Sequence, residues 1–449
     1  MLNPYPKVLV VADSSIRRAG NSGWTMYNLF QGWPPDRLAQ IYWEEHPPDS
    51  GLCGRSWKLS LDDVPLDRFL RRALRLLGTG KIHGPSVLVL RESDFGGTGC
   101  RNWGSRAKAH LKQAARAWMD WRASFRLNQR LLEWAREFHA DVIYCLSRPL
   151  RPIRLQNRLA DELGVPMLPH VMDDFMSQMY RNNWLENGPR QALRGSVGGQ
   201  VRRCPFALAI SPAMAAEYTR RFGKAFFPLM NCVDVPASWV EPHAEDGETP
   251  LSIAYVGGLH LGRFESLLET AAVVKNLRAE GMRVEIAAYE LGEDQEQQAA
   301  LERTGTVKLA GPLPAQEALR LQCLQKATVL LHLDALHGQA ATYSRLSLST
   351  KLPFYLATGR AILARAAAGS APIGYLAEHR AAATVTDPSP ERLQDALRML
   401  LINQDLRHRL GRSAWLLARA NHDAPGQRER FRLLLAAAAE RRLPGQELA

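Results

Sequence analysis

The sequence is poor in cysteine, and its cysteines follow no metal-binding or redox spacing. There are six among 449 residues, and no two of them form a Cys-x-x-Cys pair. They are Cys53, Cys100, Cys145, Cys204, Cys232 and Cys323. We therefore expect reduced, mostly buried thiols and no structural metal site.

Long apolar segments are also missing. No window approaches the ~18 uninterrupted apolar residues that a membrane-spanning helix requires. Near the amino terminus, residues 7–12 form only a short apolar run that ends at Asp13, which is not the pattern of a signal peptide. These features predict a cytoplasmic protein.

Acidic residues are too few to balance the basic ones. The chain has 57 Lys and Arg against 45 Asp and Glu, for a formal net charge of +12. This charge favours an anionic partner such as a phosphorylated substrate, a nucleic acid or an acidic lipid surface, and a diffuse basic surface is the alternative. Because no zinc finger or aromatic RNA-binding signature accompanies the charge, we do not expect nucleic acid as the partner.

Short apolar runs alternate with amphipathic stretches, and this alternation occurs twice. The runs expected to be strands are 8–11, 87–90, 142–145 and 208–210 in a first domain, and 253–256, 284–287, 307–309, 328–333, 361–364 and 382–385 in a second. Helical periodicity fills the gaps, for example over 105–139, 267–278 and 391–402. The alternation predicts an α/β protein with two parallel sheets.

The domain boundary is expected where the composition changes. Residues 236–250 contain three prolines and a glycine among acidic residues, which is typical of a linker. The predicted division is therefore a first domain over 1–240, a second over 250–405, and carboxyl-terminal helices over 406–449.

The most informative segment is residues 344–363. A polar turn with Ser349, Thr350 and Lys351 precedes a short apolar helix, which is expected to end at a glycine before a strand. Hydroxyls, an ammonium group and the N–H groups of a helix start suit an anion such as a diphosphate, and Arg345 is a further candidate to bind it. A solvated lysine at a helix start is the alternative.

A glycine-rich turn follows the first strand of the second domain. Gly257 and Gly258 end this strand, and Arg263 lies a few residues later. Glycine lets the backbone approach a phosphate without a Cβ in the way, and an arginine can bind phosphate oxygens in a bidentate manner. A tight turn with a surface arginine is the alternative.

These two segments resemble the nucleotide-sugar signature of retaining glycosyltransferases with the GT-B fold, in which two Rossmann-like domains face each other across a cleft. The family pattern is roughly Pro-Ser-Lys-Leu-x-Glu-Tyr-Leu-Ala-x-Gly-x-Pro-Val-Leu. The matching residues are Lys351, Leu352, Tyr355, Leu356, Ala357, Gly359 and Leu363, with Thr350 in place of Ser. In the family's phosphate loop, Val-Gly-Arg-Leu-x-x-x-Lys-Gly, the matches are Val256, Gly257 and Leu259, with Gly258 in place of Arg and Arg263 in place of Lys.

The resemblance implies a donor site that needs no metal ion and no cofactor. Arg263, Lys351 and helix-start N–H groups would neutralise the diphosphate of a nucleotide-sugar. Two glutamates that family members usually carry are missing, because Leu346 and Phe354 stand at their positions. The second of them binds ribose in the family, so the ribose hydroxyls would have to be recognised by another group.

The resemblance also assigns roles in the first domain. Family members often have a Gly-Gly turn after the first strand, where donor and acceptor meet, and Gly20, Asn21, Ser22 and Gly23 fit it loosely. A plain flexible loop is the alternative. The segment Ser211–Glu217 also matches a family run and is expected to end a strand and start a helix with a proline.

A further run in the first domain is similar to His-x-x-Asp-Asp-Trp in related bacterial polysaccharide and lipid glycosyltransferases. The similarity implies that His170 binds the transferred sugar and that Asp173 or Asp174 positions or deprotonates the acceptor. A buried histidine and a helix-capping aspartate are the alternatives.

One basic amphipathic segment, residues 66–77, is a candidate for contact with an anionic membrane. Its apolar residues fall on one helical face, and Arg68, Arg71, Arg72 and Arg75 fall on another. An ordinary surface helix is the alternative.

The sequence as a whole indicates a glycosyltransferase that moves a sugar from a nucleoside-diphosphate donor to a lipid-linked or polysaccharide acceptor at the inner membrane face. Retention of configuration follows from the resemblance alone. The resemblance also implies that the carboxyl-terminal helices over 406–449 pack back toward the first domain. The alternatives are a nucleotide-sugar epimerase, a catalytically silent homologue that serves as a binding subunit, and a protein that binds nucleic acid through its basic surface.

Overall fold

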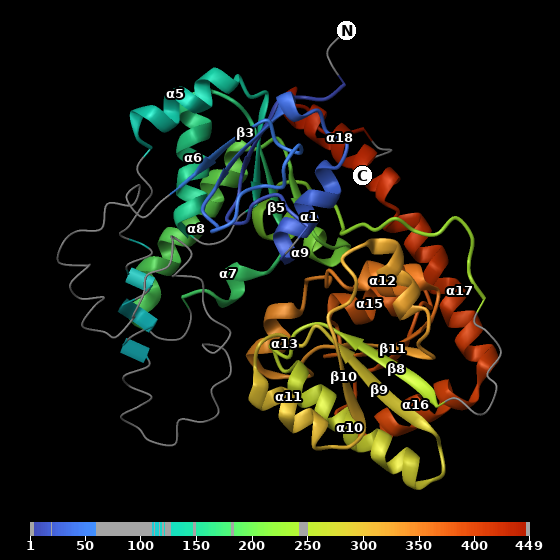
Figure 1. Ribbon diagram of the computed structural model, residues 1–449. Helices are drawn as coiled ribbons and strands as arrows, with labels where there is room; N and C mark the ends of the chain where they lie inside the picture. The colour runs from blue at the N-terminus through green and yellow to red at the C-terminus, as the bar shows by residue number, and fades with distance from the viewer. Residues whose placement is uncertain are drawn as a thin grey trace. The chain divides into compact units, whose positions relative to one another are not determined.

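The structure is a computed structural model that describes residues 4–18, 20–59, 127–146, 150–180, 184–241 and 250–445, with parts of 110–121. Two predicted elements lie outside these residues: the strand over 87–90, and the basic segment 66–77 with Arg68, Arg71, Arg72 and Arg75. The described chain divides into two compact units, one formed by residues 1–229 with 428–449 and the other by residues 230–427 (Figure 1).

The first unit is a parallel α/β unit. Its sheet has seven strands in the order β3-β2-β1-β4-β5-β6-β7. The strands are β1 (Val8–Val11), β2 (Leu38–Tyr42), β3 (Arg55–Lys58), β4 (Val142–Leu146), β5 (Met167–Val171), β6 (Ala207–Ala209) and β7 (Phe226–Pro228). The helices are α1 (Asn21–Phe30), α5 (Gln129–Phe138), α6 (Leu150–Leu163), α7 (Phe175–Gln178), α8 (Asn187–Arg203), α9 (Pro212–Phe222) and α18 (Ala424–Ala439), which begins just before the division at residue 428.

The sequence of the central strands explains why they form this sheet. β1 and β4 are wholly buried apolar runs, as expected for strands that helices cover on both faces. Val8 of β1 pairs in parallel with Leu38 of β2 on one side and Val142 of β4 on the other. Helices α6 and α8 pack together on one side of the sheet, and α1 and α18 lie on the other (Figure 1).

The second unit is also a parallel α/β unit. Its six strands have the order β10-β9-β8-β11-β12-β13. They are β8 (Leu251–Val256), β9 (Val284–Tyr289), β10 (Val307–Gly311), β11 (Val329–Leu333), β12 (Ala361–Arg365) and β13 (Ala383–Val385). The helices are α10 (Arg263–Ala279), α11 (Gln295–Glu302), α12 (Glu317–Leu324), α13 (Gly338–Ser344), α14 (Leu352–Thr358), α15 (Ala371–Glu378), α16 (Pro390–Ile402) and α17 (Gln404–Asn421).

Two groups of helices cover the second sheet. Helices α10 and α16 pack against each other over a core of Ile, Leu and Val side chains from the central strands. Helix α14 packs against both α12 and α17. The two parallel sheets expected from the sequence are therefore present.

The units divide at points that differ from the expected boundaries. The first division lies before residue 230, earlier than the predicted linker near 245, because Val233 exchanges backbone hydrogen bonds with His422 and Ala424. Helix α17 belongs to the second unit because it packs on α14 and β12. Residues 428–449, the last part of the predicted carboxyl-terminal helices, belong to the first unit.

Some local expectations were incomplete. The predicted helix over 105–139 is not continuous, because Leu127 and Asn128 are not helical and the Asn128 side chain caps α5 through the Leu131 N–H. Strands β2, β3 and β7 were not expected. The helix start predicted at Ser211 is confirmed, since the Ser211 hydroxyl accepts from the Met214 N–H at 2.9 Å and Pro212 opens α9.

Candidate functional site

The residues predicted to bind a donor gather at the carboxyl edge of the second sheet. Strand β8 lies between β9 and β11, and the chain leaves β8 through α10 toward β9 and leaves β11 toward β12. The strand order therefore reverses direction between β8 and β11. Open α/β sheets bind ligands at such a point.

The end of β8 presents bare backbone. Gly257 has φ of 120°, a conformation that favours glycine, and its N–H donates to the carbonyl of Tyr289 at 3.0 Å. A Cβ on Gly258 would lie 2.6 Å from Nδ1 of His260, so a side chain at this position would force the His260 ring to move.

Lys351 places an ammonium group beside this turn. Its Nζ is buried and has no hydrogen-bond partner among the described residues, and it lies 4.6 Å from the centroid of the Tyr255 ring. A Cβ on Gly257 would be 3.7 Å from this nitrogen. Burial, with a smaller contribution from the Arg263 charge, lowers the pKa of Lys351 to about 7. An unpartnered buried ammonium is costly unless an anion binds it.

Arg263 does not stand free at this site, in contrast to its predicted role. Its Nε donates to Oδ1 of Asp334 at 2.9 Å, its Nη2 is 2.8 Å from the same oxygen, and its Nη1 is 2.9 Å from Nε2 of His260. The cation that was expected to bind phosphate is thus already paired with a buried carboxylate. The charge of Arg263 is therefore compensated by Asp334, and its guanidinium links Asp334 to His260 in the turn.

Asp334 is a site residue that the sequence analysis missed. It follows the buried strand β11, and Nε2 of His332 lies 3.3 Å from its second oxygen. Burial opposes ionisation, but the charge of Arg263 and the contact with His332 hold the pKa of Asp334 well below its usual value. A polar residue directly after an apolar run was the signal that could have revealed it.

The turn before α14 offers fewer donors than predicted. The Leu352 N–H donates to the Ser349 carbonyl at 3.0 Å, the Lys351 N–H makes a long hydrogen bond of 3.5 Å to Oγ of Ser349, and Pro353 has no N–H. Ser349 and Thr350 are partly buried beside Lys351. The turn therefore contributes mainly the Lys351 ammonium and not a row of free N–H groups.

Arg345 lies at the far end of this segment, where it closes helix α13. The residue is exposed, and its carbonyl accepts a hydrogen bond from the Ala371 N–H at 2.6 Å. None of the described contacts connects its side chain with the buried lysine. The predicted α14, by contrast, is confirmed: it ends at Gly359, which has φ of 66°, and β12 follows.

The two positions without the expected glutamates are apolar and buried. Leu346 and Phe354 are 3% and 6% exposed, so neither offers a polar group. The guanidinium of Arg320 lies 5.2 Å from the centroid of the Phe354 ring, and its Nη2 is 2.5 Å from Oε2 of Glu290. A carboxylate from a different strand end is thus close to this ring.

In the first unit, His170 does not fit the predicted catalytic role. It is fully buried within β5, its Nδ1 is 2.7 Å from the Tyr144 hydroxyl, and its Nε2 is 3.2 Å from the Leu229 carbonyl. Burial lowers the pKa of His170 to about 3, so the ring is neutral at physiological pH. Both ring nitrogens have partners within the protein, as the buried-histidine alternative predicts.

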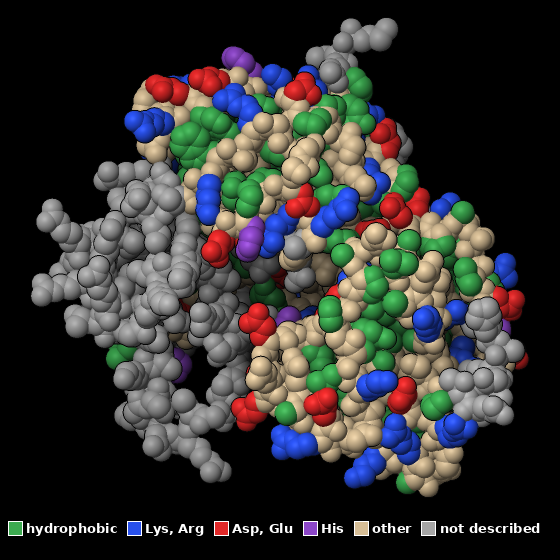
Figure 2. Space-filling model, viewed as in Figure 1, with side chains coloured by type: hydrophobic (Ala, Val, Ile, Leu, Met, Phe, Trp, Pro, Cys, Tyr) green, Lys and Arg blue, Asp and Glu red, His purple; other side chains and the backbone are tan. Residues whose placement is uncertain are grey.

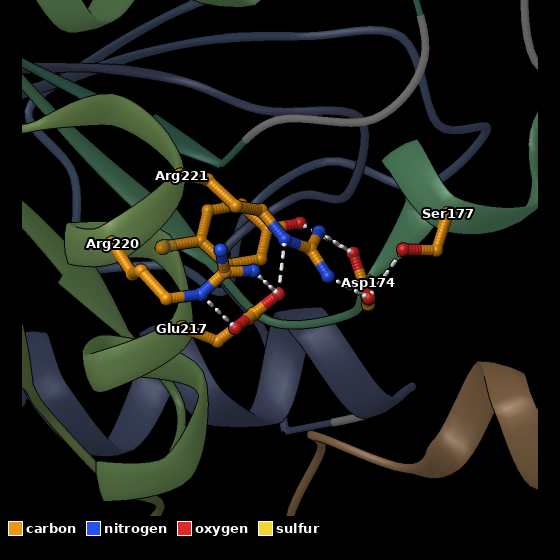
Figure 3. A network of polar contacts seen from close by, with 6 residues as sticks. Asp174, Ser177, Glu217, Arg220 and Arg221 are labelled. Atoms are coloured by element: carbon orange, nitrogen blue, oxygen red, sulfur yellow. Dashed lines mark hydrogen bonds and ion pairs between the residues drawn. The ribbon is translucent and has the colours of Figure 1, made fainter.

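Asp174 is likewise a structural residue. Figure 3 shows its carboxylate between Ser177 and Arg221, and it accepts from the two terminal nitrogens of Arg221 at 2.7 and 3.0 Å and from the Ser177 hydroxyl at 2.6 Å. Burial by itself would raise its pKa, but the hydrogen bonds from Arg221 and Ser177 outweigh burial and hold the pKa of Asp174 below its usual value. A side chain so fully bonded is not available as a base. Asp173 is partly exposed just after β5 and is the remaining candidate in this run.

The predicted acceptor-side loop is the start of a helix. Asn21, Ser22 and Gly23 form the first turn of α1, and Gly20 precedes it with φ of 69°. A Cβ on Gly23 would lie 2.9 Å from the Ser15 carbonyl, so the glycine lets α1 approach the loop after β1. The flexible-loop alternative does not hold for these residues.

The distribution of charge on the surface does not point to a particular binding partner. On the face shown in Figure 2, basic and acidic side chains are interspersed over both units instead of being sorted by sign. Within the described ranges, no group of three or more His, Cys, Asp or Glu residues is placed to hold a metal ion. No helix in the described part of the chain is both long and apolar enough to span a membrane.

Comparison with solved structures identifies the fold. Anabaena Alr3699/HepE in complex with UDP and glucose aligns over 96% of this chain and 100% of its own, with a TM-score of 0.59 and 12% identity. A UDP-forming α,α-trehalose-phosphate synthase from Burkholderia xenovorans aligns over 97% and 99%, with a TM-score of 0.59 and 12% identity. The chain has the two-domain GT-B fold.

A lipopolysaccharide outer core galactosyltransferase, WaaB, is also similar in structure. It aligns over 92% of this chain and 99% of its own, with a TM-score of 0.50 and 11% identity. No family model matches the sequence, and a search of curated proteins returned no match. At these identities the similarity establishes the GT-B fold of the chain and leaves its reaction to be argued from the site.

Proposed function

We propose that this protein is a glycosyltransferase that transfers a sugar from a nucleoside-diphosphate donor to a lipid-linked or saccharide acceptor. The observation that carries the proposal is the ammonium of Lys351, which is buried and unpartnered beside the bare turn at Gly257. A donor diphosphate would supply the negative charge that this ammonium lacks.

The chemistry of transfer explains the use of such a cation. The bond between the anomeric carbon and the β-phosphate oxygen breaks while the acceptor oxygen forms a bond to the same carbon. The acceptor proton passes to the departing diphosphate, and configuration is retained if the acceptor attacks from the face that the diphosphate leaves. Negative charge grows on the leaving group, so Lys351 stabilises the transition state more than the ground state.

The proposal also covers the donor, the acceptor contact and the place of action. The structural neighbours with UDP in their names favour a UDP-sugar as donor. We further propose that no metal or cofactor takes part, that Asp173 contacts the acceptor, and that the protein acts in the cytoplasm at the inner membrane face. The arginines of residues 66–77 would provide the membrane contact, and an Arg71→Glu/Arg72→Glu variant with unchanged binding to anionic liposomes would contradict it.

A thermal-shift series with nucleoside diphosphates and their sugars tests the donor assignment. We expect one nucleoside diphosphate to raise the Tm of the wild-type protein, and we expect Lys351→Met to abolish this shift while its own Tm is not lowered. The matched control is Lys308→Met, because Lys308 is an exposed lysine on β10 of the same unit. A wild-type protein that responds to no member of the series would refute the proposal.

A catalytically silent binding subunit is the second candidate, and a specific observation favours it. His170 and Asp174, two of the three residues predicted to be catalytic, are occupied by structural contacts. Donor binding without any release of nucleoside diphosphate in the presence of saccharide acceptors would support the silent subunit. Conversion of the donor sugar to its epimer would instead indicate an epimerase.

A further inference from the structure

A carboxylate lies on the same sheet edge as Lys351, at the end of the neighbouring strand. Glu290 follows β9 with φ of 57°, and its N–H donates to the Gly311 carbonyl at 3.1 Å. A left-handed backbone costs a non-glycine residue ~1 kcal/mol or more, and such residues are frequent at functional sites. The conformation therefore warrants a functional explanation.

An arginine from α12 holds this carboxylate in place. Arg320 from α12 donates from Nη2 to Oε2 of Glu290 at 2.5 Å, and its guanidinium lies 5.2 Å from the centroid of the Phe354 ring on α14. The side chain of Glu290 is still 30% exposed, and Oε1 makes no hydrogen bond to any described residue. One oxygen thus fixes the carboxylate and the other is available to a ligand.

The register of the sheet places this carboxylate next to the proposed diphosphate site. Val256 of β8 pairs with Tyr289 of β9, and the Gly257 N–H donates to the Tyr289 carbonyl. Gly257 and Glu290 are therefore neighbours across two strands that lie ~4.8 Å apart. Nζ of Lys351 is also within contact range of Gly257. The ammonium group and the carboxylate therefore lie along the same edge of the sheet.

We propose that Glu290 accepts hydrogen bonds from the ribose hydroxyls of the nucleotide whose diphosphate binds Lys351. A ribose has two neighbouring hydroxyl donors, and an ionised carboxylate is an acceptor with two oxygens that suits them. Arg320 acts as the positioning residue. Glu290 then performs the recognition that Leu346 and Phe354 cannot, because both are apolar. The inference rests on the proposed donor site.

Calorimetric titration of three ligands separates this role from the diphosphate site. The ligands are the nucleoside diphosphate that stabilises the wild type most, its 2′-deoxy counterpart, and inorganic pyrophosphate. The variants are Glu290→Gln, which keeps an acceptor for Arg320, and Glu293→Gln, which removes an exposed carboxylate from the same loop. We expect wild type and Glu293→Gln to bind the ribonucleotide ~10-fold more tightly than the deoxynucleotide, because one hydrogen bond to a charged group is lost.

Glu290→Gln should lose this preference to within about twofold, while its affinity for pyrophosphate stays that of the wild type. A Glu290→Gln protein that keeps the preference, or a wild type that shows none, would overturn the role of Glu290 and leave the diphosphate site intact. A wild type that binds no nucleoside diphosphate would overturn the proposed function itself. Equal Tm values for Glu290→Gln and Glu293→Gln would show that the fold is not the cause of any difference.

Discussion

In the proposed donor site, the charge of a single buried side chain, Lys351, depends on pH. Burial lowers the pKa of Lys351 to about 7, so its amino group is only partly protonated at neutral pH. A bound diphosphate would favour the charged form and raise this pKa. Binding above pH 7 must then be accompanied by uptake of a proton.

This linkage predicts the pH dependence of nucleotide affinity. Since the free lysine is increasingly neutral above pH 7, the affinity for a nucleoside diphosphate should fall as the pH rises from 7 to 9, by up to ~10-fold per unit. Titration in two buffers of different ionisation enthalpy would measure the proton taken up.

Lys351→Arg is the matched control for this prediction. Arginine stays protonated throughout this range, so the variant should bind without proton uptake and with a flat pH profile. A wild-type profile that is equally flat would exclude Lys351 as the group that titrates on binding.

The residue scale also shows the limits of sequence reasoning. Gly257 and Lys351 were predicted from residue type and pattern, and the structure does bring them together. His170 and Asp174 have the residue types of a catalytic pair, but their role depends on which partners surround them. His170 bonds to Tyr144, and Asp174 bonds to Arg221. Both partners are distant in sequence, so no local pattern reveals these contacts.

At the scale of elements, the contact between α14 and α17 is close enough to require glycine. A Cβ on Gly411 would lie only 2.2 Å from the carbonyl oxygen of Gly359, the residue that ends α14. The same carbonyl accepts from Nε1 of Trp239 at 3.1 Å. The helix that follows the Lys351 turn is therefore held directly against α17.

Gly411→Ala should destabilise the second unit by ~1–3 kcal/mol, because backbone atoms must move to admit the methyl group. Gly374→Ala is the control, since Gly374 is helical and nothing lies within 4 Å of its Cβ position. That variant should be neutral or more stable by up to ~1 kcal/mol. Chemical unfolding of both variants measures the difference, and equal stabilities would disprove the close contact.

A second element contact joins α7 to α9 through the Asp174 network. The Asp174 side chain is 1% exposed and pairs with Arg221, which also pairs with Glu217 (Figure 3). Arg221→Met would leave a buried carboxylate without its cation, at a cost of ~3–5 kcal/mol. We expect a clear loss of Tm in the first unit.

Arg220→Met is the matched control for the network. Arg220 is the neighbouring arginine, and it also pairs with Glu217, but its side chain is 73% exposed. Its removal should leave the Tm of the first unit nearly unchanged, because an exposed ion pair contributes little to stability. Two variants with the same small effect would show that the buried pair contributes little.

Sequence patterns predicted most elements of the second unit, because long apolar strands and capped helices carry clear signals. The strands that were not predicted have weak sequence signals. β3 alternates between partly buried and exposed residues at the edge of its sheet, and β7 ends in a proline. The turn at Glu290 could not be predicted from the sequence. Its left-handed backbone conformation accompanies a tertiary hydrogen bond to Gly311 and does not follow from the residue type.

At the scale of the molecule, the core of the first unit depends on a distant part of the chain. Phe431 of α18 is fully buried, and its ring lies 5.0 Å from that of Phe30 and 5.2 Å from that of Tyr144. Arg428 of the same helix donates to the Asn28 carbonyl at 2.8 Å. The resemblance had implied a last helix that returns to the first domain, whereas composition alone gave no hint of it.

Phe431→Ala should therefore destabilise the first unit selectively, by ~3–5 kcal/mol. If the two units unfold in separate calorimetric transitions, only one transition should move to lower temperature. Met399→Ala in α16 is the control, because that side chain is 51% exposed and belongs to the second unit. A shift of both transitions in Phe431→Ala would contradict a contribution confined to one unit.

The return of α18 also has a consequence for synthesis on the ribosome. Residues 230–427 leave the ribosome as one uninterrupted unit, whereas the first unit lacks Phe431 until all of these residues have been made. During elongation, the aromatic cluster of the first unit is only partly covered, because Phe431 has not yet joined Phe30, Trp33 and Tyr144. The unit whose synthesis begins first is thus completed after the second unit, and it stays exposed to chaperones while the whole of the second unit is made.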